Sequence, residues 1–425
     1  MATIDRRQFM KAGGAMGLGA SALALMAAGG SASASTTLQL SNDKAAWKPF
    51  FEAEAGAQQK AIGINWKMNE FSTTDTYQAA IRTSGGSSKV PDLYTWWSGY
   101  LMKDIVQAGY ASDVSSLWDQ NKSAYDPGLR KVFTFNGKTY GAPLYFGYWA
   151  TLYSIPAFKK YNLQPPKTWN DLVQVCDTLK SNGVTPFAAT IGGVWPGFIY
   201  WQELMIRTNP SLYLAVCSGK AKYTDSGVLD VMNMWGDWIN KGYFTDPAAT
   251  NLGTGSDNII PQLQAGKIGM VQIGTWYEAT MIAQGLKPGT DYGGFIWPNQ
   301  KSGLGNHVIF ESGPMVVGAH GSNKSDAMKS LKWFMSKEGQ QHWAKVTGFT
   351  SARKDVPSSS SVDAGLAKTV KDGHYQQLNR YWEGTPNQIA NAACNQFDKF
   401  MLHPTGAADI LSGIQSQAAS IWAQQ

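Results

Sequence analysis

The segment from Tyr140 to Gly183 constrains the fold of this chain more than any other stretch of its sequence. Its aromatic-rich apolar run at 143–155 is long enough for a buried strand that continues from one layer into another. Thr168 is a suitable N-cap for a later helix, whose apolar residues recur at i, i+3, i+4 and i+7 before Gly183 ends it. A strand followed by a capped amphipathic helix is the βα unit of an α/β protein.

Length and composition indicate a globular protein of two domains. At 425 residues the chain is too long for one ordinary core, and 43% of its residues are hydrophobic while only 16% are charged. The formal net charge of +6 is modest, and no run of lysine and arginine could follow a phosphate backbone. The sequence therefore argues against nucleic-acid binding. The aromatic residues are unusually numerous, with 17 Trp, 18 Tyr and 17 Phe.

Residues 1–34 are expected to be an export signal rather than part of the fold. Arg6–Lys11 matches the twin-arginine motif, an apolar run follows to Ala28, and Ala32–Ala34 is an A-x-A cleavage site. The run is short and rich in glycine for a membrane span. We therefore expect a soluble periplasmic protein whose mature chain begins at Ser35.

The cysteine and histidine residues predict neither a metal site nor a cofactor. The three cysteines, Cys176, Cys217 and Cys394, allow one disulfide at most, and the sequence does not select the pair. The five histidines lack the H-x-H and H-x-x-x-H spacings that are typical of metal ligands. No metal and no cofactor are expected.

Hydrophobic periodicity and turn residues locate the other elements. Strands are expected at 36–40, 63–68, 90–94, 185–190 and 292–298, with another that ends at Gly274. Helices are expected at 47–61, 75–83, 202–207, 224–240, 257–265, 325–335, 338–346, 389–402 and 407–423. The serine run at 358–361 is expected to be a surface turn.

Several tryptophans lie where the expected strands end in loops. Trp96 and Trp97 follow one strand directly, and packing explains two adjacent indoles poorly because strand neighbours point to opposite faces. Trp195 lies in a loop rich in glycine and proline, and Trp276 lies at a strand-to-helix corner. Open α/β sheets bind ligands beyond the carboxyl ends of their strands. These positions therefore predict a ligand cleft.

Three motifs are specific when they occur together: YGAPLYFGYWATLY with PKTW in 140–169, AGKIGMVQIGTW in 265–276 and TGFTSAR in 347–353. Together they resemble the carbohydrate-binding extracellular solute-binding proteins of ABC transporters, the maltose-binding-protein-like family. The resemblance covers essentially all of 36–422. It departs at Ser351, where the family usually has proline, and at Gly147–Trp149, where maltose binders carry acidic residues. The second departure argues against maltose as the ligand.

The resemblance implies a two-lobed periplasmic-binding-protein fold (type II-like) with several chain crossings at a hinge. The N-terminal lobe would comprise 35–146 and 308–351, and the C-terminal lobe 147–307 and 352–425. Crossings near Phe146, Val308 and Ala352 would let the lobes close around a ligand.

The resemblance also implies which residues bind. In the family, rings at the positions of Trp96 and Trp276 stack on a sugar. Aromatic rings can cover the C–H faces of a pyranose while polar groups satisfy its hydroxyls. The expected stacking residues are Trp96, Trp97, Trp149, Trp195 and Trp276. The expected hydroxyl partners are Asn42, Asp43, Glu278, Glu311 and Arg353. No catalytic residue is expected.

Taken together, these features predict a monomeric, non-catalytic receptor that delivers a mono- or oligosaccharide, or a glycoside, to the permease subunits of an ABC importer. The alternative is a secreted carbohydrate-active enzyme or sugar oxidoreductase, because twin-arginine export often accompanies folded, cofactor-loaded enzymes. Against it, the sequence contains no P-loop, no G-x-S-x-G, no Cys/His cofactor set and no evident pair of placed carboxylates. A receptor for peptide, polyamine or metal is a third class, which acid pairs or Tyr/His clusters would indicate.

Overall fold

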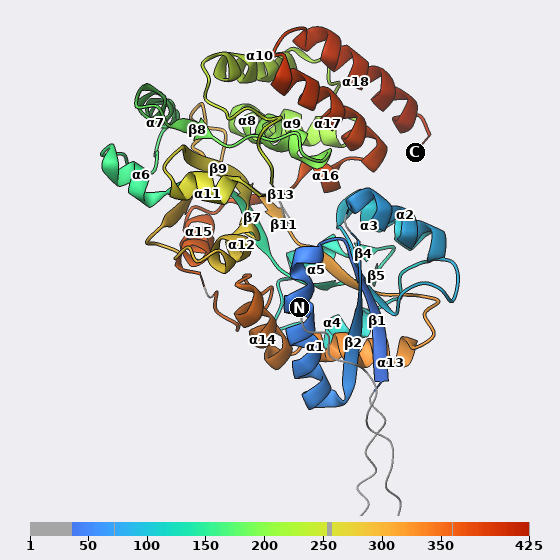
Figure 1. Ribbon diagram of the computed structural model, residues 1–425. Helices are drawn as coiled ribbons and strands as arrows, with labels where there is room; N and C mark the ends of the chain where they lie inside the picture. Colours follow the sequence, from blue (N-terminus) through green and yellow to red (C-terminus); the bar gives the residue numbers. More distant parts are fainter. Residues whose placement is uncertain (1–35, 72, 253–256, 359, 425) are drawn as a thin grey trace, which may run out of the picture. The chain divides into compact units, whose positions relative to one another are not determined.

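The computed structural model describes residues 36–424, with gaps at 72, 253–256 and 359 (Figure 1). The twin-arginine motif and the cleavage site predicted within 1–34 lie outside the described residues. The described part of the chain forms two larger β-sheets with helices packed against them, together with one two-stranded hairpin. The predicted α/β class is confirmed.

The first sheet has the strand order β2-β1-β3-β12-β6. Its strands are β1 (Thr36–Asn42), β2 (Ile64–Glu70), β3 (Leu93–Thr95), β6 (Ala142–Pro143) and β12 (Pro314–Val317). β1 pairs in parallel with β2 and β3, and β12 pairs antiparallel with β3. The carboxyl ends of β1 and β3 therefore meet at one edge, where the Thr95 hydroxyl donates to Asn42 Oδ1 at 3.1 Å.

The helices that pack on the first sheet bury aromatic residues between them. They are α1 (Lys48–Ile62), α2 (Thr74–Ser84), α3 (Gly99–Gln107), α4 (Ser115–Gln120), α5 (Pro127–Val132), α13 (Lys324–Phe334) and α14 (Lys337–Thr347), with the hairpin β4 (Thr134–Phe135) and β5 (Lys138–Thr139). α1 packs on β2 and against α13 and α14 (Figure 1). Phe51 of α1 lies 5.0 Å from Trp343 of α14 between ring centroids, so this core is continuous from helix to helix.

The second sheet has the order β13-β11-β7-β9-β8, and β10 also pairs with β7. Its strands are β7 (Gly147–Ser154), β8 (Thr185–Phe187), β9 (Ile268–Gly274), β10 (Tyr292–Phe295), β11 (His307–Glu311) and β13 (Gln376–Asn379). β7 and β9 are almost wholly buried, which explains their near-continuous apolar sequences.

The βα unit predicted at 140–183 is present in the second sheet. β7 leads into α6 (Ile155–Lys160) and then into α7 (Trp169–Ser181). Thr168 and Asp171 form a reciprocal capping box at the start of α7, which satisfies backbone N–H groups that the helix itself leaves unpaired. Gly183 follows the helix with a φ of +75°, a conformation that glycine adopts without strain.

The remaining helices surround the second sheet. They are α8 (Ile199–Thr208), α9 (Pro210–Cys217), α10 (Ser226–Asn240), α11 (Ile259–Gln264), α12 (Tyr277–Ala283), α15 (Ser361–Asp372), α16 (Tyr381–Gly384), α17 (Asn387–Leu402) and α18 (Ala407–Trp422). α17 packs on α18 (Figure 1). It also packs on the short 3₁₀ turn Trp195–Phe198. Trp201, in α8, is fully buried, so it belongs to the core.

The chain passes between the two sheets at three places in the described residues. The first lies between β6 and β7, next to the expected position at Phe146. The second was expected near Val308, but it falls between Glu311 and Pro314, because β11 still pairs with β7 and β13 of the second sheet. The third follows Ala352, which is buried with the first sheet, and precedes α15, which packs on β10. The residue boundaries of the two lobes stay a prediction.

The serine run at 358–361 is not a surface turn throughout. Ser360 is buried and is the N-cap of α15, where its hydroxyl accepts from Val362 and Asp363 backbone N–H groups. The same hydroxyl donates to Glu278 of α12. The prediction was wrong because the polar partners of Ser360 come from distant residues.

Candidate functional site

A pocket of about 500 Å³ lies where strands of both sheets end. Asp43 follows β1, Trp97 follows β3 and Trp276 follows β9, so each side chain stands beyond the carboxyl end of its strand. The described residues that line the pocket are Asp43, Lys44, Trp47, Thr74, Trp97, Trp195, Leu252, Asp257, Trp276, Tyr277, Thr280, Ala283, Gln284, Glu311, Arg380 and Trp382. Large aromatic rings with a few directed polar groups are typical of a ligand site.

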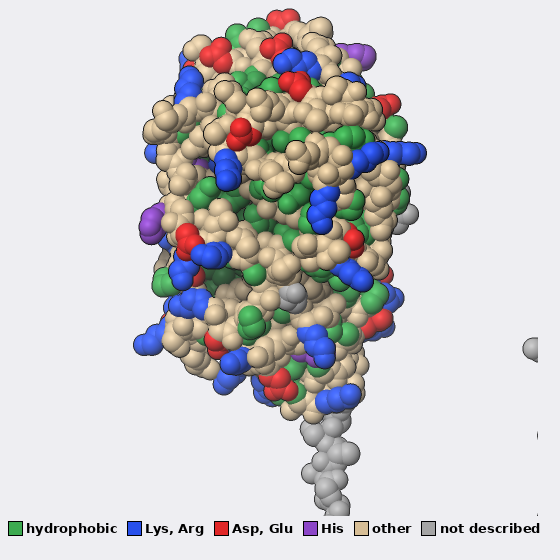
Figure 2. All heavy atoms as spheres, turned by 90° about the vertical axis from the view of Figure 1, so that its left-hand side faces the viewer, with side chains coloured by type: hydrophobic (Ala, Val, Ile, Leu, Met, Phe, Trp, Pro, Cys, Tyr) green, Lys and Arg blue, Asp and Glu red, His purple; other side chains and the backbone are tan. Residues whose placement is uncertain are grey.

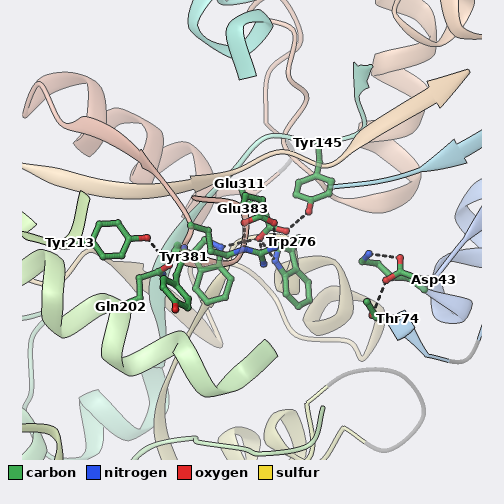
Figure 3. Close-up of polar contacts among 12 residues, drawn as sticks. Asp43, Thr74, Tyr145, Gln202, Tyr213, Trp276, Glu311, Tyr381 and Glu383 are labelled. Atoms are coloured by element: carbon green, nitrogen blue, oxygen red, sulfur yellow. Dashed lines mark hydrogen bonds and ion pairs between the residues drawn. The ribbon is translucent and has the colours of Figure 1, made fainter. Parts of the chain in front are cut away.

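One wall of the pocket comes from the first sheet. The Lys44 ammonium donates to Asp43 Oδ1 at 2.7 Å and lies over the rings of Trp47 and Trp97, at 5.1 and 5.4 Å from their centroids. Asp43 Oδ2 accepts from the Thr74 hydroxyl at 3.1 Å (Figure 3). These contacts hold a charged pair and two indoles in a fixed arrangement.

The opposite wall comes from the second sheet. Trp276 is the N-cap residue of α12, and its ring lies 6.2 Å from that of Trp195 in an edge-to-face arrangement. Gly274 permits this arrangement, because a Cβ there would stand 2.4 Å from Trp276 Nε1 and 3.2 Å from Trp149 Nε1. The absence of a side chain at Gly274 is therefore part of how the wall is built.

The carboxylate of Glu311 lies at the base of the pocket and collects hydrogen bonds from several elements (Figure 3). Oε1 accepts from Tyr145 Oη at 2.6 Å. Oε2 accepts from Trp149 Nε1 at 2.9 Å, Trp276 Nε1 at 3.1 Å and Arg380 Nη1 at 3.0 Å. Since Tyr145 precedes β7 and Glu311 ends β11, the hydrogen-bonded cluster around Glu311 lies beside two of the crossings.

Arg380 is buried between two carboxylates. Besides its bond to Glu311, it donates through Nε to Glu383 Oε2 at 2.7 Å and through Nη2 to Glu383 Oε1. Burial alone would lower the pKa of Arg380, but the charges of Glu311 and Glu383 outweigh it and raise the pKa. Burial raises the pKa of Glu383, and the charge of Arg380 opposes this shift. The guanidinium thus stays charged at the base of the pocket.

Half of the ten predicted site residues line this pocket. They are Asp43, Trp97, Trp195, Trp276 and Glu311. Their approach from both sheets agrees with the expected convergence of indole rings, although a ligand role for each stays a prediction.

The other five predicted residues are buried away from the lining, so their positions do not support direct contact with a ligand. Trp96 is 3% exposed and donates to the Leu101 carbonyl, and Trp149 is 1% exposed and donates to Glu311. Asn42 binds the Lys44 carbonyl, at the bend that presents Asp43. The other two are Glu278 and Arg353.

Glu278 and Arg353 are engaged in structural contacts. Glu278 accepts from Tyr292 Oη at 2.9 Å and from the Ser360 hydroxyl, and burial raises its pKa to about 7. Arg353 binds Asp355 through Nε and Nη2, at 2.9 and 3.0 Å, and the Met335 carbonyl through Nη1. Both side chains tie helices and loops together.

Sequence reasoning missed several lining residues, above all Lys44, Trp47, Arg380 and Trp382. Lys44 directly follows Asp43, and Trp47 comes four residues after Asp43, so the loop after the first strand could have been taken as a whole. The segment Arg380–Glu383, at the start of α16, combines two charged residues with two aromatic residues. That composition was the available signal.

Other features of the described residues place limits on the site. A hollow of about 660 Å³ lies elsewhere, on 167–170 and the loop 297–306, and its wall is mostly exposed loop.

No cluster of three or more His, Cys, Asp or Glu residues could hold a metal ion in the part of the chain described. The three cysteines are free and buried. Among the helices at 36–424, outside the gaps, none is long and apolar enough to cross a membrane.

Surface charge on the face shown is mixed. Lys and Arg side chains (blue) are interspersed with Asp and Glu side chains (red) over this face (Figure 2). This face therefore carries no continuous basic surface of the kind that binds a phosphate backbone.

The fold and the pocket define a class: an α/β ligand-binding protein of two sheets joined by repeated crossings, with its site at the strand ends. Residues 39–341 match the family model of the bacterial extracellular solute-binding proteins, and the chain belongs to this family. The family predicted from the sequence motifs is thereby confirmed. Membership of an extracellular family indicates that the protein is exported.

Individual relatives agree with this assignment. An ABC transporter extracellular-binding protein of Pyrococcus horikoshii is 25% identical over 277 residues, which span 64% of this chain and 60% of the relative. The multiple sugar-binding protein of Streptococcus mutans is 23% identical over 69% of this chain and 74% of its own. The crystal structure of the bacterial solute receptor AcbH superposes with a TM-score of 0.81 at 18% identity, covering 91% of this chain and 100% of that one. The two-domain solute-binding fold is therefore confirmed.

Proposed function

We propose that this protein is a carbohydrate receptor that binds a mono- or oligosaccharide, or a glycoside, and delivers it to an ABC importer. The observation that carries the proposal is a single pocket with Trp97 on one wall and Trp195 and Trp276 on the other. Opposed indoles can cover both faces of a pyranose, and the acids and bases around them can bind its hydroxyls. The relative in Streptococcus mutans is a multiple sugar-binding protein, and AcbH is described as preferring β-D-galactopyranose, which supports the same ligand class.

The proposal includes a cellular setting. The chain would be exported through its twin-arginine signal, cleaved after Ala34 and act in the periplasm as a monomer. Its partners would be the ligand and the permease subunits of the transporter, and it would bind the sugar without converting it.

Hinge closure is part of the proposed mechanism. Lobes that follow the two sheets would move about the three crossings, and a ligand would favour the closed form only by its greater affinity for that form. Trp97 and Trp276 come from different sheets, so both can contact one sugar only when the walls are close enough together.

The test is isothermal titration of a sugar panel against the wild type and Trp276→Ala. We expect the variant to lose more than about tenfold in affinity, because a stacking ring is removed. The unliganded protein should lose only about 2 kcal/mol, from one hydrogen bond to Glu311 and the edge-to-face contact with Trp195. Trp169→Ala is the matched control, since Trp169 is half-buried against Trp238 and does not line the pocket.

Two results would contradict the proposal. A large loss of unliganded stability in Trp276→Ala, with affinity unchanged, would make Trp276 a core residue. Chemical conversion of a bound sugar, detected by chromatography of the ligand after incubation with the protein, would establish an enzyme instead.

A further inference from the structure

The charges that line the pocket are not balanced. Among the described residues, the lining acids are Asp43, Asp257 and Glu311, and the lining bases are Lys44 and Arg380. Glu383 lies directly behind Arg380 and adds a further carboxylate to the same group. The wall therefore presents more acids than bases to whatever enters.

Each lining base in the described residues already has an acidic partner. Lys44 Nζ lies 2.7 Å from Asp43 Oδ1, and Arg380 donates to Glu311 at 3.0 Å and to Glu383 at 2.7 Å. Arg380 is held on two sides by these carboxylates and is almost fully buried, so it cannot turn toward a ligand without breaking them. An anionic ligand would have to compete with these partners at close range.

Hydrogen-bonding chemistry also favours a neutral ligand over an anionic one. A carboxylate or phosphate group is mainly an acceptor, and the lining acids are acceptors too, so the two cannot hydrogen-bond when both are ionised. A sugar hydroxyl both donates and accepts, so it can bind Glu311 Oε1, which accepts one hydrogen bond from the described residues. Burying an anion without a free base beside it is costly, whereas a neutral hydroxyl meets partners of either kind.

We infer that the pocket is selective for carbohydrates that carry no acidic group, and that it rejects uronates and sugar phosphates. This inference rests on the proposed function and narrows its ligand class. The specificity arises because the chain's own acids, Asp43 on one wall and Glu311 and Glu383 at the base, occupy the bases that an acidic sugar would need.

The experiment compares matched pairs by isothermal titration of the whole mature protein. The probes are D-galactose with D-galacturonate and D-glucose with D-glucuronate, extended to neutral and uronic oligosaccharides, with glucose 6-phosphate as the phosphate probe. We expect each acidic member to bind at least about 100-fold more weakly than its neutral counterpart, because its charge would be buried unpaired. A uronate or sugar phosphate that binds as tightly as the neutral sugar would overturn the inference and leave the carbohydrate function intact. No binding anywhere in the panel would count against the proposed function instead.

A charge variant tests the cause. Asp43→Asn removes the carboxylate that holds Lys44, and its amide can still bind the Thr74 hydroxyl. The ratio of neutral to uronate affinity should fall at least about tenfold, because the ammonium can then pair with the ligand. Asp119→Asn is the control, since Asp119 pairs with Arg130 outside the pocket and the substitution changes the net charge equally. Because the ratio is taken within one variant, general weakening does not affect it, and an unchanged ratio would refute this cause of selectivity.

Discussion

Replacing Glu311 tests whether one carboxylate holds both the base of the pocket and the neighbouring crossings. Its oxygens accept from Tyr145, Trp149, Trp276 and Arg380 at 2.6 to 3.1 Å. Glu311→Ala removes all four contacts, and Glu311→Gln keeps the shape but removes the charge and turns one oxygen into a donor. Both variants leave Arg380 with Glu383 as its remaining carboxylate.

The expected magnitude follows from burial. The side chains of Glu311 and Arg380 are 9% and 6% exposed, so water has little access to their ion pair. Arg380 keeps Glu383 as a counter-charge, so the loss comes mainly from the other donors that lose their acceptor, and each buried donor left unpaired typically costs about 1–3 kcal/mol. We expect Glu311→Ala to lose about 3–5 kcal/mol in total, and Glu311→Gln to lose about 2–3 kcal/mol, because an amide oxygen still accepts some of the hydrogen bonds.

Urea unfolding of the unliganded protein measures the loss, with Glu52→Gln as the control for a glutamate that is exposed on α1. A double-mutant cycle of Glu311→Ala with Trp276→Phe isolates the indole contact, since alanine removes the acceptor while phenylalanine keeps a ring and removes only the N–H. We expect a coupling of about 1 kcal/mol. If Glu311→Gln unfolds within about 0.5 kcal/mol of the wild type, the carboxylate does not organise this region and the reasoning is wrong.

Two further predictions concern the pocket wall and a buried acid. Gly274→Ala should weaken ligand binding more than about tenfold with little change in secondary structure, since the added Cβ would displace the indoles of Trp276 and Trp149. Calorimetric titration measures the affinity and circular dichroism the secondary structure. Unchanged affinity would contradict this prediction and show that the pocket wall adapts. Burial raises the pKa of Glu54 from its ordinary value of 4.5 to about 9, so the folded state holds a proton that the unfolded state releases near pH 4.5. Stability should therefore fall as pH rises between these values, by about 1.4 kcal/mol per unit, and Glu54→Gln should remove this component. Urea midpoints of the wild type and Glu54→Gln are compared from pH 6.5 to 8.5, above the lowered pKa of His342, which contacts Glu54. If the two midpoints change with pH in parallel, the prediction is wrong.

Local patterns in the sequence were sufficient for the secondary structure and for part of the site. The capping box at Thr168 and the strand that ends at Gly274 depend on near neighbours, and both lie where the sequence predicts. Trp276 was predictable for the same reason, because a strand-to-helix corner is a local feature. The short helix α3 was missed, since its start at Gly99 carries no side-chain cap.

Long-range packing decided the rest of the site. Whether Trp96 or Trp97 faces the pocket depends on Tyr77, which packs against both rings, and on the Leu101 carbonyl that holds the indole of Trp96. Arg380 and Glu311 are 69 residues apart in sequence, and no local period links them. Sequence reasoning could place aromatic residues near a cleft, but it could not choose which of two adjacent rings is buried.

The position of Glu311 connects the pocket to the crossings through direct contacts. The Trp276 indole lines the pocket, and its N–H shares Glu311 Oε2 with Arg380, while Oε1 binds Tyr145 at the start of another crossing. A ligand that presses on the Trp276 ring therefore acts on the carboxylate that Tyr145 also binds. Rotation about the crossings, in turn, moves Tyr145 relative to Trp276 and changes how well both donors can reach Glu311. If closure occurs as proposed, the ring and the hinge change together because they share one acceptor, and Glu311→Gln should then alter the ligand-induced change in small-angle scattering as well as the affinity. A variant that binds weakly yet closes as fully as the wild type would separate the two roles and disprove the link.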